Sequence, residues 1–293
     1  MSTHSLPPNS PPLRTWQPLL DLALAEDIGP GDVTTEIVLG AEAKGRARIE
    51  ARQDLVVCGL FVAEEVFGQV DAHLQFSAAH REGERVAAGD VLAFVEGSMR
   101  SILSAERTAL NFLGRLSGIS TLTSRYRDAV SGTGCQIVDT RKTLPGWRVL
   151  DKFAVRAGGG INHRFALFDG ILLKDNHVAA AGGVREAMKS ARAHAPAGLR
   201  IQIEVESLEE AQSACEAGAD FLLLDNCSPQ QVRTIVKELG SDALLEASGG
   251  INLENVREFA TAGVHRVSIG ALTHSAQAVD VALEIEDGPG RRP

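Results

Sequence analysis

The second half of the chain alternates short apolar runs with amphipathic helical stretches, and this alternation constrains the fold more than any other feature. The apolar runs cover residues 136–139, 171–173, 200–205, 220–224, 243–246 and 265–269. Helical patterns occupy intervals such as 184–194, 208–217 and 253–262. Strands that alternate with helices at this spacing form parallel βαβ units. Six such units predict an α/β barrel that is incomplete beside the usual eight-unit form.

The first part of the chain has a mixed pattern and predicts a separate α+β domain. Helices are expected at 16–25 and 61–70, with short strands within 45–60 and 73–97. A long helix with Ser104 as its N-cap is expected to lead into the barrel. The predicted organisation is therefore a flexible tail at 1–15, an α+β domain at 16–117 and a barrel domain at 118–277.

Charge and cysteine content limit the classes of partner. A net charge of −9 argues against a general nucleic-acid or anionic-membrane binder, because such proteins carry a basic surface that neutralises phosphates. The four cysteines show neither metal-type spacing nor the framework of a small secreted domain, and the first residues lack the pattern of a signal peptide. These features predict a reduced, cytoplasmic protein.

Each apolar run of the second half ends in a polar or glycine cluster. In a parallel α/β barrel the carboxyl ends of all strands meet at one mouth, where the catalytic residues of such enzymes lie. The side chains after the strands should therefore line one pocket. The clusters are Thr140-Arg141-Lys142, Lys174-Asp175-Asn176-His177, Glu204 with Glu206, Asp225-Asn226, Ser248-Gly249-Gly250 and Ile269-Gly270-Ala271.

The last two clusters predict a phosphate site. Their glycines let a ligand approach the backbone, and each cluster precedes a helix whose N-terminal amides favour an anion. A phosphate is commonly bound after the final two strands of a barrel. A single glycine pair would more often be a plain turn, but two such clusters in the expected place favour a binding site.

Basic residues gather at the same mouth, although the chain as a whole is acidic. Arg141, Lys142, Arg164 and Lys174 lie at strand ends, with His163 beside Arg164. This crowding indicates a polyanionic substrate, since arginine grips carboxylates with two donors and lysine suits phosphate as a point charge. The alternative is a set of surface charges or salt bridges.

The sequence pattern allows more than one role for each of two acids and two histidines. Glu204 and Asp225 could bind Mg²⁺ or ribose hydroxyls, or could balance neighbouring lysines. His163 could contact substrate or form a hydrogen bond within its loop. His274 could help to hold a phosphate or could cap the last helix.

Motifs along nearly the whole chain resemble those of the quinolinate phosphoribosyltransferase family, also called nicotinate-nucleotide pyrophosphorylases. The resemblance rests on AEDIGPGDVTT (25–35), ERTALNFLGRLSGIST (106–121), DTRKTLPGWR (139–148), GGGINHR (158–164), LLKDNH (172–177), IEVES (203–207), LLDN (223–226), EASGGI (246–251) and SIGALTHS (268–275). The motifs appear in the family's order. A small departure is Leu144, where the family more often has Thr.

The resemblance implies an open α+β sandwich beside an incomplete barrel, with the C-terminal segment 278–290 joining the sandwich. It also implies a homodimer or a higher homo-oligomer, without deciding between dimer and hexamer. In that family the arginine that matches Arg107 reaches into the neighbouring subunit's active site. The active site would then be shared between subunits.

The resemblance further implies decarboxylating transfer of a phosphoribosyl group from phosphoribosyl pyrophosphate (PRPP) to quinolinate in NAD biosynthesis. Lys142, Lys174, Glu204 and Asp225 would be catalytic, with Mg²⁺ held by the two acids directly or through water. The substrate-binding set would comprise Arg107, Thr140, Arg141, Lys142, His163, Arg164, Lys174, Glu204, Asp225, Ser248, Gly249, Gly250, Ile269, Gly270, Ala271 and His274.

Two rival functions remain at this point. One is a phosphoribosyltransferase for a pyridine with a single carboxylate, such as nicotinate, which releases no CO2. The number of cations argues against it, because three arginines and a lysine suit two carboxylates better than one. The other is a binding protein that carries a phosphometabolite, and this would be expected only if catalytic charges were missing.

Overall fold

The computed structural model describes residues 10–240 and 243–286, which form two compact units. Of the described residues, 10–124, 144–159 and 275–286 belong to the first unit, and 125–143, 160–240 and 243–274 belong to the second. Residues 118–124 and 144–159, which the sequence-based ranges place in the barrel domain, fall in the first unit. Residues 1–9 of the expected tail and 287–290 of the expected C-terminal segment lie outside the described residues. Within 10–15, a short 3-10 helix, η1, spans Leu13–Thr15.

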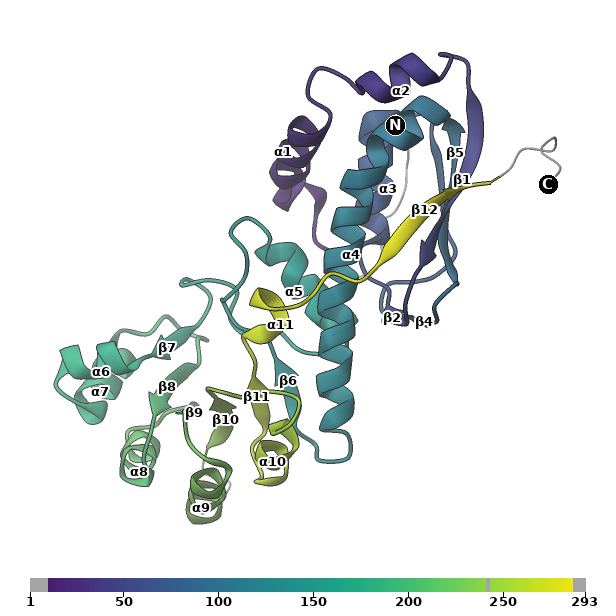
Figure 1. Ribbon diagram of the computed structural model, residues 1–293. Coiled ribbons are helices and arrows are strands. Elements are labelled where there is room, and N and C mark those ends of the chain that lie inside the picture. Colours follow the sequence, from purple (N-terminus) through teal and green to yellow (C-terminus); the bar gives the residue numbers. More distant parts are fainter. Residues whose placement is uncertain (1–9, 241–242, 287–293) are drawn as a thin grey trace. The chain divides into compact units, whose positions relative to one another are not determined.

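An antiparallel four-stranded sheet organises the first unit, in the order β12-β1-β5-β3 (Figure 1). Its C-terminal strand pairs with β1, so that Ala51 lies opposite Val281. A two-residue pair, β2 and β4, completes the strands. The bounds are β1 Lys44–Ala51, β2 Leu55–Val56, β3 Gln75–Ala78, β4 Arg85–Val86, β5 Val91–Ser98 and β12 Val281–Ile285.

Aromatic side chains join the helices of the first unit. Trp16, Phe61 and Phe153 form successive edge-to-face contacts, with ring centroids 5.7 and 5.1 Å apart. Such pairs stabilise a core beyond the area that they bury. The helices are α1 Gln17–Asp27, α2 Val33–Val38, α3 Leu60–Val70 and α5 Arg148–Ala157, together with the first part of α4 Met99–Ala129.

The long helix α4 begins earlier than the sequence suggested. It starts at Met99, directly after β5, so the prediction of Ser104 as its N-cap is wrong. The Ser104 hydroxyl instead donates to Asp32 at 3.1 Å, and Ser98 Oγ accepts the Ser101 N–H at 3.4 Å. A serine that serves a distant carboxylate cannot be distinguished from a helix cap by local pattern alone.

A parallel six-stranded sheet forms the second unit, in the order β6-β11-β10-β9-β8-β7. The strands β6 and β7 lie at the two ends of this order and do not pair with each other. The sheet is therefore an incomplete α/β barrel, as the sequence predicted. The helices that connect the strands lie along its outer face (Figure 1). The strands are β6 Gln136–Val138, β7 Ile171–Leu173, β8 Ile201–Val205, β9 Phe221–Asp225, β10 Leu244–Ser248 and β11 Arg266–Ser268. The helices are α6 Asp175–Ala181, α7 Val184–His194, α8 Leu208–Glu216, α9 Pro229–Leu239, α10 Val256–Thr261 and α11 Ala271–His274.

Polar side chains are buried within this otherwise apolar sheet. All five residues of β8 are buried, including Gln202 and Glu204, and Glu246 on β10 has no exposed surface. Burying such groups is costly unless each finds a partner. Their partners identify the site described below. None of the helices in residues 10–240 and 243–286 has the length and apolar character needed to cross a bilayer.

Candidate active site

A cavity of about 690 Å³ opens at the carboxyl ends of the second unit's strands. Its volume is in the range of small-molecule sites. The sequence-predicted residues that line it are Thr140, Arg141, Lys142, His163, Arg164, Lys174, Asp225, Ser248, Gly249, Gly250, Ile269, Gly270, Ala271 and His274. The strand tips therefore meet around one hollow, as the barrel argument requires.

Backbone contacts place Lys142 beside the last glycine turn. Its N–H donates to Thr140 Oγ1 at 3.0 Å, and its carbonyl accepts the Thr273 hydroxyl at 2.9 Å. A Cβ atom on Gly270 would lie 3.0 Å from Lys142 Cδ and 3.1 Å from the His274 ring. Glycine at this position thus lets both side chains approach the turn.

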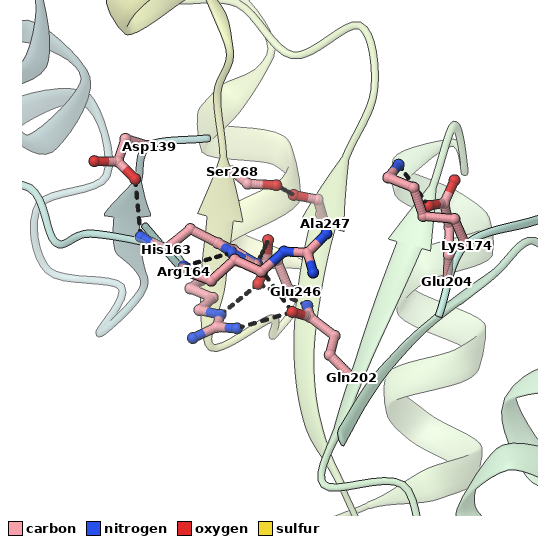
Figure 2. Close-up of polar contacts among 10 residues, drawn as sticks. Asp139, His163, Arg164, Lys174, Gln202, Glu204, Glu246, Ala247 and Ser268 are labelled. Carbon is pink, nitrogen blue, oxygen red and sulfur yellow. Dashed lines mark hydrogen bonds and ion pairs between the residues drawn. The ribbon is translucent and has the colours of Figure 1, made fainter. Parts of the chain in front are cut away.

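Lys174 and Glu204 form an ion pair at the carboxyl ends of the neighbouring strands β7 and β8 (Figure 2). Lys174 Nζ lies 2.9 Å from Glu204 Oε2, with the Glu204 side chain 8% exposed and that of Lys174 49% exposed. Burial raises the pKa of Glu204, and the nearby Asp225 and Asp175 add to this, although Lys174 opposes the shift. The acid therefore balances a lysine in the absence of ligand, which was one of the two roles expected for it. Glu204 is not among the residues that line the cavity.

Asp225 is oriented by Asn226, which belongs to the strand-end cluster predicted from the sequence but not to the predicted substrate-binding set, and which lines the cavity. Asn226 Nδ2 donates to Asp225 Oδ2 at 2.6 Å, and the Asn226 N–H donates to the Ser248 carbonyl at 2.9 Å. Asn226 itself has a φ of +52°, the left-handed region in which asparagine is tolerated. Its position directly after Asp225 in LLDN was the available signal.

The glycine turn after β10 depends on that asparagine. Gly249 has a φ of +94°, and a Cβ there would lie 2.3 Å from Asn226 Oδ1. Gly250 follows at +61° and has open space around its Cβ position. Consecutive residues of this kind expose backbone amides to a ligand.

The helix part of the phosphate prediction fits one of the two glycine clusters more closely than the other. The short helix α11 begins at Ala271, within the last cluster, but α10 begins at Val256, six positions beyond Gly250. The helix expected at 253–262 does follow Ser248-Gly249-Gly250, but it starts three residues later than predicted, so its first amides are farther along the chain from the cluster than expected. The turn 252–255 intervenes, where Asn252 Oδ1 accepts the Glu254 and Asn255 N–H groups.

Two arginines stand close together at the cavity. Arg164 Nη1 donates to the Gly170 carbonyl at 3.0 Å, and the Phe165 and Ala166 N–H groups hold Asp169 in the same loop. Burial lowers the pKa of Arg164, and the charge of Arg141 lowers it further, against a raising effect of Asp169. Like charges in a partly buried site favour an anionic ligand between them.

His163 lines the cavity and also forms hydrogen bonds within the protein. Its Nε2 lies 2.9 Å from Gln202 Oε1, and its N–H donates to buried Asp139 at 2.8 Å. Glu246 also lines the cavity and was not predicted as a site residue. The sequence feature that could have identified Glu246 and Gln202 is a charged or amide side chain within an otherwise apolar strand.

Arg107 lies on α4 in the first unit. There it lines a smaller cavity of about 300 Å³, together with Asn111 and residues 278–281. The described residues contain no group of three or more His, Cys, Asp or Glu side chains that could hold a metal ion.

Comparisons with known proteins agree over almost the whole chain. Residues 32–117 and 119–284 match the N-terminal and C-terminal domains of quinolinate phosphoribosyl transferase. A probable nicotinate-nucleotide pyrophosphorylase (carboxylating) of Bacillus subtilis strain 168 is 41% identical, covering 91% of this chain and 92% of the relative. A nicotinate-nucleotide pyrophosphorylase (carboxylating) of Mycobacterium leprae is 42% identical over 90% of this chain and 94% of the relative.

Solved structures show the same architecture. The nicotinate-nucleotide pyrophosphorylase from Francisella tularensis superimposes with a TM-score of 0.92 at 35% identity, covering 97% of this chain and all of the other. One from Ehrlichia chaffeensis gives a TM-score of 0.88 at 37% identity, with 92% and 98% covered. The chain belongs to the quinolinate phosphoribosyl transferase family.

Proposed function

We propose that the strand-tip cavity is the place where this chain transfers the phosphoribosyl group of PRPP to quinolinate. The products are nicotinate mononucleotide, pyrophosphate and CO2, the reaction of the family in NAD biosynthesis. The observation that carries the proposal is the meeting of cationic side chains, Asp225 and two glycine turns around one hollow. A diacid and a sugar phosphate together need that combination.

The diacid fits the arginine side of the cavity. Arg141 and Arg164 provide planar donors for carboxylates, and Lys174 lies on the same wall. Burial lowers the pKa of Arg164, and repulsion by the Arg141 guanidinium lowers it further; a bound dianion would relieve that repulsion. Through the resemblance, Arg107 of a neighbouring subunit would complete this half of the site.

PRPP fits the glycine side. The turns at 248–250 and 269–271 offer backbone amides to its 5′-phosphate, with Thr140 and His274 near them on the wall. Lys142 would face the pyrophosphate, and Asp225 and Glu204 the ribose hydroxyls.

Mg²⁺ fits this donor set as an ion shared with the substrate. Mg²⁺ is commonly held by one or two carboxylates plus substrate phosphates and water, and not by a cage of protein ligands. Glu204 and Asp225 are two such carboxylates, close enough for Asp225 to raise the pKa of Glu204. When bound, the ion would neutralise charge that develops on the departing pyrophosphate.

The proposed chemistry needs no covalent enzyme intermediate. The pyridine nitrogen forms a bond to C1 of the ribose as the bond from C1 to the pyrophosphate oxygen breaks, with positive charge on the sugar ring. Lys142 would stabilise the leaving group, and the acids would favour the positive sugar. When the adjacent carboxylate departs as CO2, the electron pair of the broken bond stays on the ring carbon, where the neighbouring quaternary nitrogen stabilises it, and that carbon then takes a proton.

We also propose an oligomeric assembly and a cellular location for the chain. A homodimer or larger homo-oligomer would bring Arg107 to a neighbour's cavity. A cytoplasmic location fits the four cysteines, which are all free thiols.

One assay tests the proposed function. Purified chain is incubated with PRPP, Mg²⁺ and either quinolinate or nicotinate, and pyrophosphate, mononucleotide and CO2 are measured. Turnover of quinolinate with equal amounts of CO2 and pyrophosphate is expected. Turnover of nicotinate without CO2 would favour the monocarboxylate transferase, and tight PRPP binding without turnover of either acid would favour a binding protein.

A further inference from the structure

A chain of buried polar side chains runs beneath the cavity wall, from Arg266 through Glu246 and Gln202 to His163. Gln202 is 4% exposed and Glu246 is fully buried. The side chains of His163 and Arg266 are 11% and 17% exposed. They come from β8, β10, β11 and the loop before β7. Figure 2 shows His163, Gln202 and Glu246 turned toward one another.

Glu246 fixes the orientation of the Gln202 amide. A carboxylate only accepts hydrogen bonds, and Glu246 Oε2 accepts from Arg266 Nε at 2.5 Å and from Gln202 Nε2 at 2.9 Å. Gln202 Oε1 must then point the other way, toward His163 Nε2 at 2.9 Å. Arg266 is itself held over the Phe221 ring, 4.1 Å from its centroid.

Two hydrogen-bond partners of the imidazole indicate which nitrogen carries hydrogen, and Glu246 Oε1 lies farther away, 3.7 Å from Nε2. His163 Nδ1 lies 2.8 Å from the Arg164 backbone N, and a backbone N–H can only donate. Nδ1 is therefore an acceptor without hydrogen. The hydrogen of the neutral ring lies on Nε2, which donates to Gln202 Oε1. A hydrogen on Nδ1 would point at the Arg164 N–H hydrogen.

We propose that Glu246 is a positioning residue which, through Gln202, holds His163 as the neutral tautomer with its hydrogen on Nε2 and thereby fixes the backbone at Arg164. His163 then shapes the cavity wall without adding a positive charge. The charges that face substrate come from Arg141, Lys142, Arg164 and Lys174. The link from Arg164 to quinolinate rests on the proposed function, whereas the tautomer does not.

Nitrogen NMR of the ligand-free protein reads the tautomer directly. Since the chain has eight histidines, the His163 signals are assigned by their loss in His163→Asn. At neutral pH we expect Nδ1 to give the signal of an unprotonated ring nitrogen and Nε2 that of a protonated one. The opposite tautomer, or an imidazolium with both nitrogens protonated, would overturn the proposal.

Glu246→Gln tests the role of the carboxylate with little change in size. A glutamine at 246 can donate as well as accept, so Gln202 can flip. The other His163 tautomer, which gives up the hydrogen bond from the Arg164 N–H, should then become populated in the spectrum. The quinolinate KM should rise about three- to tenfold while the PRPP KM changes less than about twofold, a coupling typical of one hydrogen-bonded network.

Glu50→Gln is the matched control, because Glu50 is also buried and bonded to an arginine, Arg48 Nε at 2.7 Å, but in the first unit's sheet. It should leave the spectrum and both KM values unchanged. An unshifted tautomer in Glu246→Gln, or equal effects of both substitutions, would contradict a positioning role. If wild-type protein fails to use quinolinate, the proposed function fails while the spectrum still decides the tautomer.

Discussion

At the scale of the residue, Arg164 combines a structural and an electrostatic constraint. Its backbone N–H donates to His163, its guanidinium donates to Gly170, and its pKa is lowered by burial and by Arg141. A cation held in this way next to another cation is stabilised when an anion binds. We therefore expect the Arg164 side chain to contribute to ligand affinity and not to the free energy of unfolding.

Replacing Arg164 with alanine should raise the quinolinate KM at least about tenfold, equivalent to about 1.4 kcal/mol. Steady-state kinetics with saturating PRPP measures this. Arg233→Ala on α9, an exposed arginine, serves as the control and should leave KM unchanged. An unaltered quinolinate KM in Arg164→Ala would remove that side chain from the site.

Gly249 and Gly250 offer a comparison within one turn. Both have positive φ, but a Cβ at 249 would meet Asn226 and one at 250 would meet nothing within 4 Å. Gly249→Ala should therefore reduce the free energy of unfolding by roughly 1–3 kcal/mol more than Gly250→Ala. Urea denaturation of the two variants measures the difference. Equal destabilisation would mean that Asn226 can move aside at little cost.

Single residues also show where sequence reasoning ends. Lys142, Lys174 and Asp225 could be predicted because charged residues that follow an apolar run lie at a strand tip. Glu246 and Gln202 could not be assigned, because whether a polar residue within a run faces the barrel interior depends on strand register and on partners far apart in sequence.

At the scale of the element, helix α3 begins against a carboxylate from another segment. Glu82 accepts the Gly59 N–H at 2.7 Å and the Phe61 N–H at 3.3 Å. Burial nevertheless raises the pKa of Glu82 above its ordinary value of 4.5. The folded state thus binds this proton more tightly than the unfolded chain does, so Glu82 contributes less stability as pH rises from about 4.5 through the raised pKa.

Glu82→Gln should therefore gain stability relative to wild type between pH 4.5 and neutrality. Denaturant titrations at both ends of that range give the difference. Glu84→Gln provides a control of opposite sign, because the Arg81 N–H lowers the pKa of Glu84. Its loss relative to wild type should grow as pH rises from the lowered pKa of Glu84 through about 4.5, so this control is measured over that lower range. A Glu82→Gln difference that is independent of pH would contradict the raised pKa.

Elements with a clear period were predictable, and those defined by tertiary contacts were not. The expected ranges 171–173 and 184–194 coincide with β7 and α7. By contrast, α4 starts five residues before the expected Ser104, and α10 begins three residues after the expected 253. Helix ends depend on which distant group satisfies the terminal amides, and a local pattern does not contain that information.

At the scale of the whole molecule, the open question is whether a neighbouring subunit supplies part of the site. The family resemblance implies that Arg107 serves another subunit's cavity, whereas Arg164 serves the cavity of its own chain. Two variants with weakened quinolinate use, Arg107→Ala and Arg164→Ala, should then complement each other when coexpressed and assayed at low quinolinate, since one site of each mixed dimer carries neither substitution.

Random pairing makes half of the dimers mixed, and each mixed dimer has one intact site, so about one quarter of wild-type activity is expected in the whole population and about one half in mixed dimers isolated through both tags. The assay uses equal amounts of the two differently tagged chains, and mixed dimers are purified through both tags. The control is a mixture of the two separately purified variants that was never allowed to exchange subunits. Activity that stays at the level of the separate variants would show that each cavity uses only its own chain's residues.

The central claim is that the strand tips of the second unit bind both substrates in one cavity. A crystal structure of the protein with quinolinate and a non-reactive PRPP analogue tests it most directly. The account predicts the pyridine carboxylates beside Arg141 and Arg164, and the 5′-phosphate on the turns at 248–250 and 269–271. Well-defined density for either ligand outside this cavity, with the cavity itself containing only water, would contradict it.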